Sequence, residues 1–371
     1  MMLNRKFSNS SARVFGLLCL FLSTVSFAQN YTAEKTTDHG VAVVRLTDSE
    51  NGVVVSIVPS VGNRAYEMKV HGQNILWFPT DDISQFVKRP QLGGIPLLAP
   101  WADILDEDAF WANGKRYGFN MSLGNIRGPI PGAGFLTDSP LWEVTEVAAD
   151  SHSAHVTSRL QFWKKPDYMA QWPFAQEYEM TYSLSGGVLE VRTTITNLST
   201  DPMPISIGFH TFYQIPGIPR DEWTAHFPAR AHVVADEHKF STGEMRPTGL
   251  PDPLPLGNLQ LPDAFTSQDA WRTGKPWAGF DDGFTDFERD ADGRAHFWIE
   301  AGGKKVEALF GPKYQVATIW LPPSQQHIAM ESLTAIIDGL NLARQGKYPA
   351  LQIVPPGGKW TESFWIRASG I

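Results

Sequence analysis

The feature that most constrains the fold is a succession of short β-patterned runs separated by glycine-containing turns. Runs rich in β-branched and apolar residues occur at residues 41–46, 53–58, 189–196 and 305–310. Turn signals punctuate the chain at Asn51-Gly52, His71-Gly72, Asn113-Gly114, Ser185-Gly186-Gly187 and Asp292-Gly293. Only residues 81–87 and 335–345 have a helix-like pattern, and both segments are short. Many strands at short spacing without intervening helices predict an all-β fold, a large antiparallel β-sandwich.

The N-terminal segment, residues 1–28, is predicted to be a signal peptide. Its first 13 residues carry three basic side chains, and an apolar run follows at residues 14–25. That run is too short to cross a bilayer as a helix, which needs about 20 residues. Ser26 and Ala28 supply the small residues that a signal peptidase recognises, so cleavage is expected after Ala28.

Cys19 is the only cysteine of the 371 residues and lies within this segment. Leu18 precedes it, whereas a lipid-anchored cysteine usually follows a small residue, so we expect a soluble exported protein that is periplasmic or secreted. The mature chain then has no disulfide and no thiol nucleophile. We expect residues 29–371 to form a single domain, with the proline-rich stretch 247–262 as a surface excursion.

The charge of the chain argues against some classes of partner. The formal net charge is −8, and removal of the three basic residues of the signal peptide takes it to −11. A charge of this sign disfavours binding to nucleic acid or to an anionic membrane. Thirteen Trp and 22 Phe supply flat apolar faces of the kind that sugar sites use, although most of them are expected in the core.

Several segments, in order along the chain, resemble the galactose mutarotase (aldose 1-epimerase) family. The strongest is WPFAQEYEMTYSLSGGVLEVRTTITNLSTDPMPISIGFHTFYQI, which ends in a Gly-x-His-x-aromatic motif. The others are VVVSIVPSVGNRAYEMKVHGQNILW, GGIPLLAPWADILDEDAFWANGKRY, GFDDGFTDF, and HIAMES followed by GLN and PPGGKW. Each motif is weak alone, but the ordered set covers most of the mature chain. The resemblance implies the galactose mutarotase-like sandwich, or supersandwich, and a monosaccharide or other small carbohydrate as substrate.

The resemblance also implies roles for particular residues. Interconversion of sugar anomers needs a base and an acid on opposite sides of one sugar, and requires neither a metal nor an organic cofactor. Glu331 matches the base that removes the proton of the C1 hydroxyl, and His210 the acid that protonates the ring oxygen. Asp281 or Asp282 matches the residue that hydrogen-bonds the sugar hydroxyls.

Each assignment has a structural alternative. Glu331 could be the solvent-facing residue of an alternating strand, and His210 a buried histidine bonded to a backbone carbonyl. Asp281 and Asp282 could cap a turn before Gly283. Trp101 and Trp320 are candidates to stack on a sugar, although core packing is the expectation for both.

Three positions depart from the family pattern. The family has an Asn-Arg pair where this chain has Asp103 and Ile104, and a histidine where this chain has Arg127. We hypothesise that Arg127 restores the lost cationic donor, because a guanidinium suits vicinal hydroxyls or a carboxylate. The preferred sugar would then carry an acidic group, such as a uronate. A surface ion pair is the alternative for Arg127.

Three other functions compete with a mutarotase. The chain could be a carbohydrate-binding protein without turnover, or a different enzyme on the same sandwich, such as a polysaccharide lyase or another sugar epimerase. A metal site is the third. Its candidate ligands are His152 and His155, three residues apart, and His226, His232 and His238, six apart. A spacing of three places two strand residues on opposite faces, which argues against the first pair.

Overall fold

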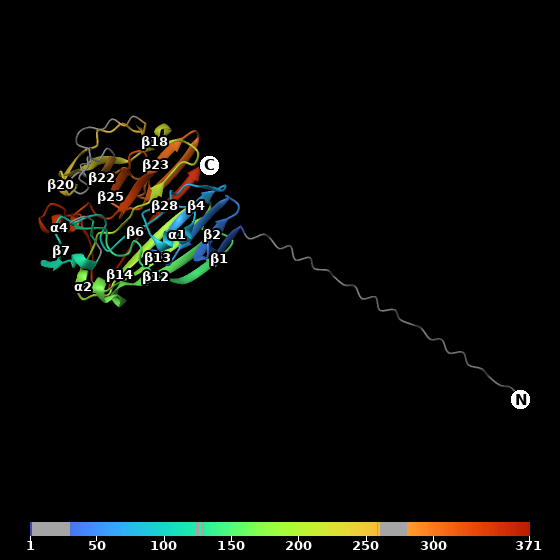
Figure 1. The fold of residues 1–371 in the computed structure, drawn as a ribbon, viewed down its shortest axis with the longest axis horizontal. Helices are drawn as coiled ribbons and strands as arrows, with labels where there is room; N and C mark the ends of the chain where they lie inside the picture. Colours follow the sequence, from blue (N-terminus) through green and yellow to red (C-terminus); the bar gives the residue numbers. More distant parts are fainter. Residues whose placement is uncertain (2–29, 124–125, 128–129, 258, 260–279) are drawn as a thin grey trace.

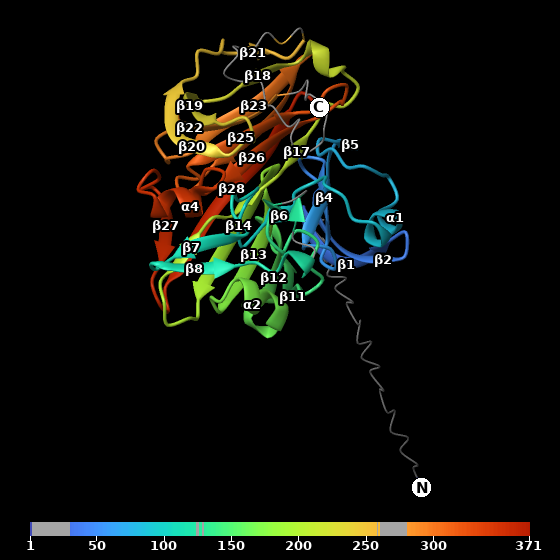
Figure 2. The ribbon, with the colours of Figure 1, turned by 60° about the vertical axis from the view of Figure 1, so that its left-hand side comes forward.

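The computed structural model describes residues 1, 30–123, 126–127, 130–257, 259 and 280–371. Within them, strands that pair antiparallel account for most of the regular structure, and helices are short (Figures 1 and 2). The prediction of an all-β antiparallel sandwich is confirmed. Residues 41–46, 53–58, 189–196 and 305–310, predicted as strands, lie within strands β2, β3, β14 and β24, whose bounds follow.

A five-stranded meander begins the described fold. Its order follows the sequence, and its members are β1 (Tyr31–Asp38), β2 (Val41–Asp48), β3 (Val53–Val58), β4 (Arg64–Val70) and β5 (Gln73–Asn74). The Asn51-Gly52 and His71-Gly72 turns join neighbouring strands, as their sequences predict. The meander lies against the N-terminal strands of the next sheet, on the blue side of Figure 1.

The largest sheet of the described residues has nine strands. In spatial order they are β11 (Glu143–Ala149), β12 (Ala154–Gln161), β13 (Gln176–Ser185), β14 (Val188–Asn197), β28 (Lys359–Ser369), β24 (Lys304–Phe310), β23 (Ala295–Ala301), β18 (Thr224–His226) and β21 (Leu254–Pro255). Strand β28, close to the end of the chain, lies between β14 and β24. This interleaving favours the single domain predicted for residues 29–371, which stays a prediction.

A second large sheet carries the candidate site. Its order is β20 (Ser241–Pro247), β19 (Ala229–Ala235), β22 (Phe280–Phe287), β25 (Val316–Leu321), β26 (Ile328–Leu333), β16 (Gly208–Phe209) and β6 (Leu97–Leu98), and β17 (Phe212–Tyr213) also pairs with β26. Small ladders complete the described strands: β7 (Ala109–Ala112) with β8 (Lys115–Gly118), β9 (Ile126–Arg127) with β10 (Ile130–Pro131), and β15 (Met203–Ile205) with β27 (Gln352–Val354).

The core lies where the two large sheets face each other. Phe209 of β16 contacts Phe364 of β28 with ring centroids 4.9 Å apart, and Phe287 of β22 meets Phe297 of β23 at 5.2 Å. Along β22, buried side chains that face the core alternate with less buried side chains on the other face of the sheet. Phe280, Asp282 and Phe284 are buried, whereas Asp281 and Gly283 between them are less buried. One face of this sheet is therefore left for the site.

The helices match the sequence patterns in part. Those of the described residues are α1 (Ile83–Lys88), α2 (Pro166–Gln171) and α4 (Gly339–Arg344), with single 3₁₀ turns at Met121–Leu123, Phe162–Lys164 and Arg220–Glu222. Asp82 caps α1, because its Oδ1 accepts a hydrogen bond from the Ser84 N–H at 2.9 Å. Helix α4 is shorter than the predicted residues 335–345, since Asp338 before it adopts a left-handed conformation with φ of 60°. No helix of the described part is long and apolar enough to cross a membrane.

Candidate active site

Glu331 and His210 lie opposite each other on the outer face of the second large sheet. Thr318 of β25 pairs with Glu331 of β26, and Gly283 of β22 pairs with Thr318 in turn. His210 continues this row, because it lies between Phe209 and Phe212, which pair with Ser332 and Ala329. Residues paired across a sheet present their side chains to the same face. The register therefore brings together two residues that are 121 positions apart in sequence.

The side chains of this pair are in direct contact. The His210 Nε2 atom lies 3.1 Å from the Glu331 Oε1 atom, and Glu331 is only 3 % exposed. A carboxylate so deeply buried needs a hydrogen-bonding or charged partner, and His210 supplies one. The pair is closer than the sequence-based expectation of groups on opposite sides of a sugar. The C1 hydroxyl oxygen and the ring oxygen are bonded to the same carbon, so a neighbouring acid and base can still reach both.

Local packing holds His210 in place. Its backbone N–H donates to the Pro96 carbonyl at 3.0 Å, and its ring stacks on Phe212 at 4.6 Å between centroids. Gly208, two residues earlier, has no space for a side chain, because a Cβ atom there would overlap Leu333 of β26. The glycine of the Gly-x-His motif thus has a physical reason: it lets β16 approach β26 and places His210 beside Glu331.

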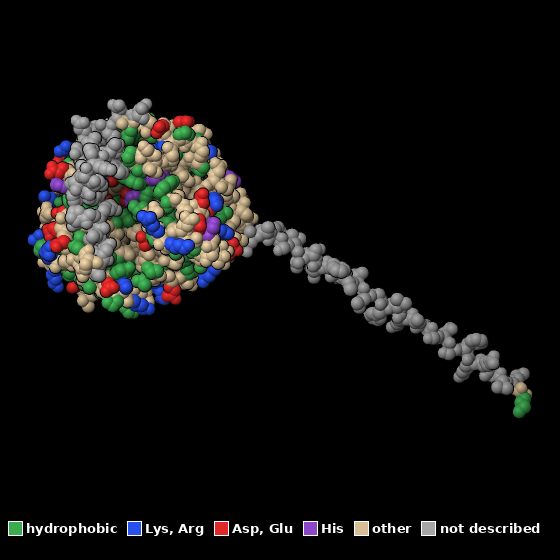
Figure 3. All heavy atoms as spheres, viewed as in Figure 1, with side chains coloured by type: hydrophobic (Ala, Val, Ile, Leu, Met, Phe, Trp, Pro, Cys, Tyr) green, Lys and Arg blue, Asp and Glu red, His purple; other side chains and the backbone are tan. Residues whose placement is uncertain are grey.

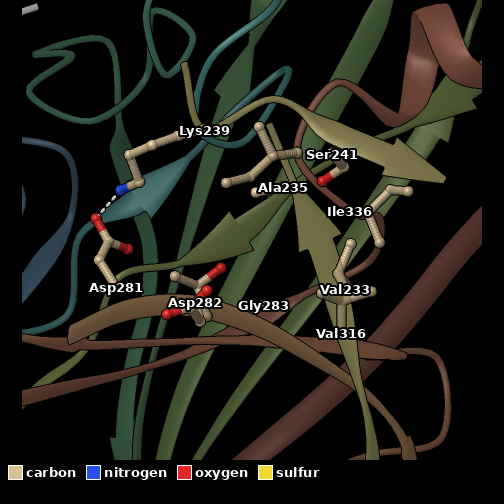
Figure 4. Close-up of a pocket in the computed structure, with 11 residues that line it drawn as sticks. Val233, Ala235, Lys239, Ser241, Asp281, Asp282, Gly283, Val316 and Ile336 are labelled. Carbon is tan, nitrogen blue, oxygen red and sulfur yellow. Dashed lines mark hydrogen bonds and ion pairs between the residues drawn. The ribbon is translucent and has the colours of Figure 1, made fainter. Parts of the chain in front are cut away.

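Asp281 lies on the same face, two strands away from Glu331. It pairs with Trp320 of β25, which pairs with Ala329 of β26, so Asp281 is offset from the Glu331 row by two residues. Its carboxylate forms an ion pair with the Lys239 ammonium from the turn between β19 and β20 (Figure 4). Sequence reasoning missed Lys239, because nothing in its local sequence distinguishes it from a surface lysine.

Asp282 differs from Asp281 in its surroundings. It is buried on the side of β22 that carries Phe280 and Phe284, and burial followed by the charge of Asp281 raises its pKa to about 8. Its Oδ2 atom has no hydrogen-bond partner among the described residues. Asp282 is therefore protonated at neutral pH, whereas Asp281 is ion-paired. Of the two predicted aspartates, Asp281 is the one that shares a face with Glu331.

Aromatic rings form a wall beside His210. Trp320 is half-buried and meets the His210 ring edge-on at 5.8 Å, and Phe212 lies 5.9 Å from Trp320. Behind them, the buried His327 ring stacks on Trp77 at 3.9 Å. Burial, with a smaller effect of the Arg220 charge, lowers the pKa of His327 to about 4, so its ring is neutral. The sequence assigned His327 to the motif of Glu331 but gave it no role.

A recess of about 330 Å³, including its open mouth, lies on this face. Charged and polar residues line it together with small apolar ones: Val233, Ala235, Lys239, Ser241, Asp281, Asp282, Gly283, Val316, Thr318, Ile336 and Ile337. Figure 4 shows Lys239 and Asp281 pointing toward each other at one side of the recess.

The predicted Trp101 does not reach this face. It is fully buried in an aromatic cluster, with Phe119 at 4.7 Å and Trp172 at 6.1 Å between ring centroids. An indole without exposed surface cannot stack on a sugar, so we correct this prediction and leave Trp101 out of the site. Core packing, the alternative for Trp101, is what the structure shows.

The other two predicted residues, Asp103 and Arg127, lie outside the strands that carry Glu331 and Asp281. Asp103 is half-buried in the loop after β6, in a left-handed conformation with φ of 56°. Arg127 lies in β9, where it pairs with Ile130, and its side chain is outside the described residues. Within the described part of the chain, no group of three or more His, Cys, Asp or Glu side chains is arranged to hold a metal ion.

Known families and solved structures resemble this chain. A model of the aldose 1-epimerase family matches residues 43–367, a range that includes His210, Asp281 and Glu331. A galactose mutarotase-like protein from Clostridium acetobutylicum has a similar structure, with a TM-score of 0.78 and 21% identity over 93% of this chain and 100% of that one.

Two further structures extend the comparison. A protein from Synechocystis sp. PCC 6803 is 26% identical, with a TM-score of 0.66 over 93% of this chain and 100% of its own. Galactose 1-epimerase from Lactobacillus acidophilus NCFM is 14% identical, with a TM-score of 0.65 over 92% and 98% of the two chains. At 14% and 21% identity, the likeness shows the fold alone.

Proposed function

This chain belongs to the aldose 1-epimerase family, and on that premise we propose that it interconverts the α and β anomers of a free hexose or related sugar. The family match supports an isomerase that acts on a sugar. The observation that carries the finer proposal is the 3.1 Å contact between His210 Nε2 and Glu331 Oε1 on a sheet face that also carries Asp281 and Trp320. Ring opening requires a base that reaches the C1 hydroxyl and an acid that reaches the ring oxygen, and two neighbouring side chains can do both because these oxygens share one carbon.

The proposed reaction begins with a protonated His210 and an ionised Glu331. Glu331 takes the proton of the C1 hydroxyl, His210 gives its Nε2 proton to the ring oxygen, and the bond between C1 and the ring oxygen breaks. The open-chain sugar now has an aldehyde at C1 and a hydroxyl where the ring oxygen was. No atom is lost, and the two side chains have exchanged protonation states.

Ring closure reverses these transfers on the other face of the aldehyde. A half turn about the bond between C1 and C2 presents that face to the new hydroxyl. As the oxygen attacks C1, His210 recovers its proton and Glu331 returns one to the aldehyde oxygen. Both side chains regain their starting states, so the site is ready for another sugar. Trp320, half-buried beside His210, offers a flat surface to the C–H side of the ring.

The test is the rate at which freshly dissolved α-anomers reach equilibrium, followed by polarimetry or NMR. The panel contains neutral and uronic sugars, because Arg127 predicts an acidic substituent. Wild-type protein is compared with Glu331→Gln and His210→Asn, and with Glu300→Gln, an exposed residue of β23, as the matched control. We expect acceleration by the wild type and by the control, and a loss of about 10²–10⁴-fold in each site variant.

The opposite outcome would support a different function. A wild-type protein that binds sugars without accelerating any of them would be a carbohydrate-binding protein or an enzyme of another kind. Full activity in Glu331→Gln or in His210→Asn would remove that residue from the proposed catalytic pair. Equal rates for neutral and uronic sugars would rule out the acidic preference argued from Arg127.

A further inference from the structure

Lys239 occupies a backbone conformation that a lysine seldom adopts. Its φ is 70°, in the left-handed region where glycine and asparagine are favoured. The turn that contains it is tightly bonded: Asp236 Oδ1 accepts hydrogen bonds from the His238 and Phe240 N–H groups at 2.9 and 3.0 Å, and the Lys239 N–H donates to the Asp236 carbonyl at 3.0 Å. Glycine would adopt this backbone conformation with less strain, so we infer that the lysine side chain itself has a role at this position.

The side chain enters the recess instead of solvent. It is only 8 % exposed, and its ammonium pairs with the Asp281 carboxylate, as Figure 4 shows. Lysine is rarely buried unless it is paired. The turn between β19 and β20 therefore places the Lys239 ammonium beside the Asp281 carboxylate of β22, on the face that carries Glu331 and His210.

The charges around this recess are balanced among the described lining residues. Lys239 and Asp281 neutralise each other, and Asp282 is protonated at neutral pH because burial and the charge of Asp281 raise its pKa to about 8. Besides this ion pair, the Thr318 hydroxyl indicates that the recess takes a polar ligand. Thr318 lines the recess, is 1 % exposed, and its Oγ1 has no hydrogen-bond partner within the residues that the structure describes. Buried hydroxyls are normally hydrogen-bonded, so a group of the ligand or a water would complete it.

We propose that Lys239 and Asp281 act as one unit that recognises an uncharged sugar hydroxyl, with the Lys239 ammonium donating a hydrogen bond to its oxygen and the Asp281 carboxylate accepting a hydrogen bond from its O–H. This inference rests on the proposed function and adds to it the group that reads the sugar away from C1. Asp281 lies two strands from Glu331, about 10 Å across the sheet. One monosaccharide and the two side chains can bridge that separation. Lys239 is thus a specificity residue that takes no part in proton transfer.

The experiment combines a substitution in the protein with the removal of single hydroxyls from the sugar. Wild type, Lys239→Met and Asp281→Asn are assayed with the best sugar of the panel and with its monodeoxy derivatives. The double variant Lys239→Met/Asp281→Asn is included because it leaves no unpaired charge in the recess. Lys35→Met, on the exposed face of β1, is the control. Circular dichroism and thermal melting show whether each variant folds.

We expect Lys239→Met to raise KM about tenfold with kcat nearly unchanged, because a hydrogen bond to a charged group is lost equally in the ground and transition states. With one particular deoxy sugar, the wild type should already show the raised KM, and neither single variant nor the double variant should raise it further. A folded Lys239→Met or double variant with wild-type KM for every sugar would overturn the inference. So would a loss that is equally large for all deoxy sugars.

The two proposals can fail separately. If the wild type accelerates no sugar, the mutarotase proposal fails, and the same comparison is made with dissociation constants from tryptophan fluorescence. A selective loss of affinity for one hydroxyl would then still support the Lys239–Asp281 unit. If the wild type is active and Lys239→Met leaves both KM and the deoxy-sugar pattern unchanged, only the further inference fails.

Discussion

Asp281 and Asp282 show how much the surroundings of two adjacent residues can differ when their side chains point to opposite faces of one strand. From the sequence the choice between them was open, because both precede Gly283 and both could cap a turn. In the structure, the period of two along β22 leaves Asp281 half-buried with Lys239 and buries Asp282 with Phe280 and Phe284. Burial raises the pKa of Asp282, so at neutral pH its carboxyl is protonated in the folded chain but not in the unfolded chain.

This proton makes stability depend on pH. The folded-state pKa of Asp282 is about 8, above its ordinary value of 3.8, so between pH 4 and pH 8 the folded chain binds a proton that the unfolded chain does not. Stability therefore falls as pH rises through this window, by up to about 1.4 kcal/mol per pH unit from this group. Asn mimics the neutral carboxyl, so we expect Asp282→Asn to be more stable than wild type at pH 8, by about 2 kcal/mol or more, and nearly equal to it at pH 4.

Urea denaturation at several pH values between 4 and 8 measures the effect. Asp286→Asn is the matched control, because Asp286 lies on the same strand but is exposed, 3.5 Å from Arg230. Among the described residues, Asp286 takes part only in an exposed ion pair, so Asp286→Asn should stay close to wild type in stability. Parallel stability curves for Asp282→Asn and wild type would show that Asp282 is ionised in the folded protein.

Single residues also mark the limit of sequence reasoning. His210 and Glu331 were identified because they sit in motifs, and the structure brings them into contact. Trp101 was named as a candidate although core packing was expected, because an indole in the core and an indole at a sugar site have the same sequence signature. Only tertiary packing, here against Phe119 and Trp172, distinguishes the two. Lys239 was missed because its importance comes from a turn conformation and from Asp281, 42 residues away.

At the scale of elements, most strands could be recognised and their order in the sheets could not. Residues 189–196 read as a strand from their composition, and β14 covers them with one residue more at each end. Nothing in the sequence places β28 beside β14, because pairing between distant strands depends on the whole core. Helix α2 was not predicted from the sequence.

The contact between β16 and β26 decides the geometry of the catalytic pair. A Cβ atom at Gly208 would overlap the Leu333 side chain and lie 2.9 Å from the Ser332 carbonyl oxygen. We expect Gly208→Ala to cost about 1–3 kcal/mol of stability, because overpacking forces backbone shifts. It should also lower kcat at least tenfold, since the shift moves His210 away from Glu331. Thermal melting and the anomer assay measure the two effects.

Gly118→Ala is the control for this substitution. Gly118 ends β8, and a Cβ atom there would meet only the Arg116 side chain, at 3.8 Å. Its stability and kcat should stay close to those of the wild type. A Gly208→Ala protein with unchanged kcat would show that the pair tolerates a displaced β16, and that the glycine of the motif serves the fold alone.

At the scale of the whole molecule, acidic and basic side chains are mixed over the face in Figure 3, in the part that the structure describes. The two large sheets form one scaffold: the inner faces build the core, and the outer face of the second sheet carries the candidate site. Strands far apart in the sequence enter this scaffold, from β6 at residue 97 to β28 at residue 369. Such a site depends on long-range pairing, so local propensity predicts its elements but not its assembly.

The start of the described fold bears on the proposed export of the chain. Asn30 accepts a backbone hydrogen bond from Ser49 at 2.8 Å, its side chain donates to Glu50 at 3.1 Å, and β1 pairs with β2 from Tyr31 onward. Cleavage after Ala28 would leave all of these contacts in place. We propose that the protein is exported and cut there, and we expect protein recovered from the periplasm of a bacterial host to begin at Gln29 by intact-mass measurement. Ala28→Arg should block processing, because the peptidase requires a small residue at that position, whereas Ala33→Arg within β1 should not. Wild-type protein that stays in the cytoplasm and retains Met1 would contradict export, and would leave residues 1–28 without the role that their sequence predicts.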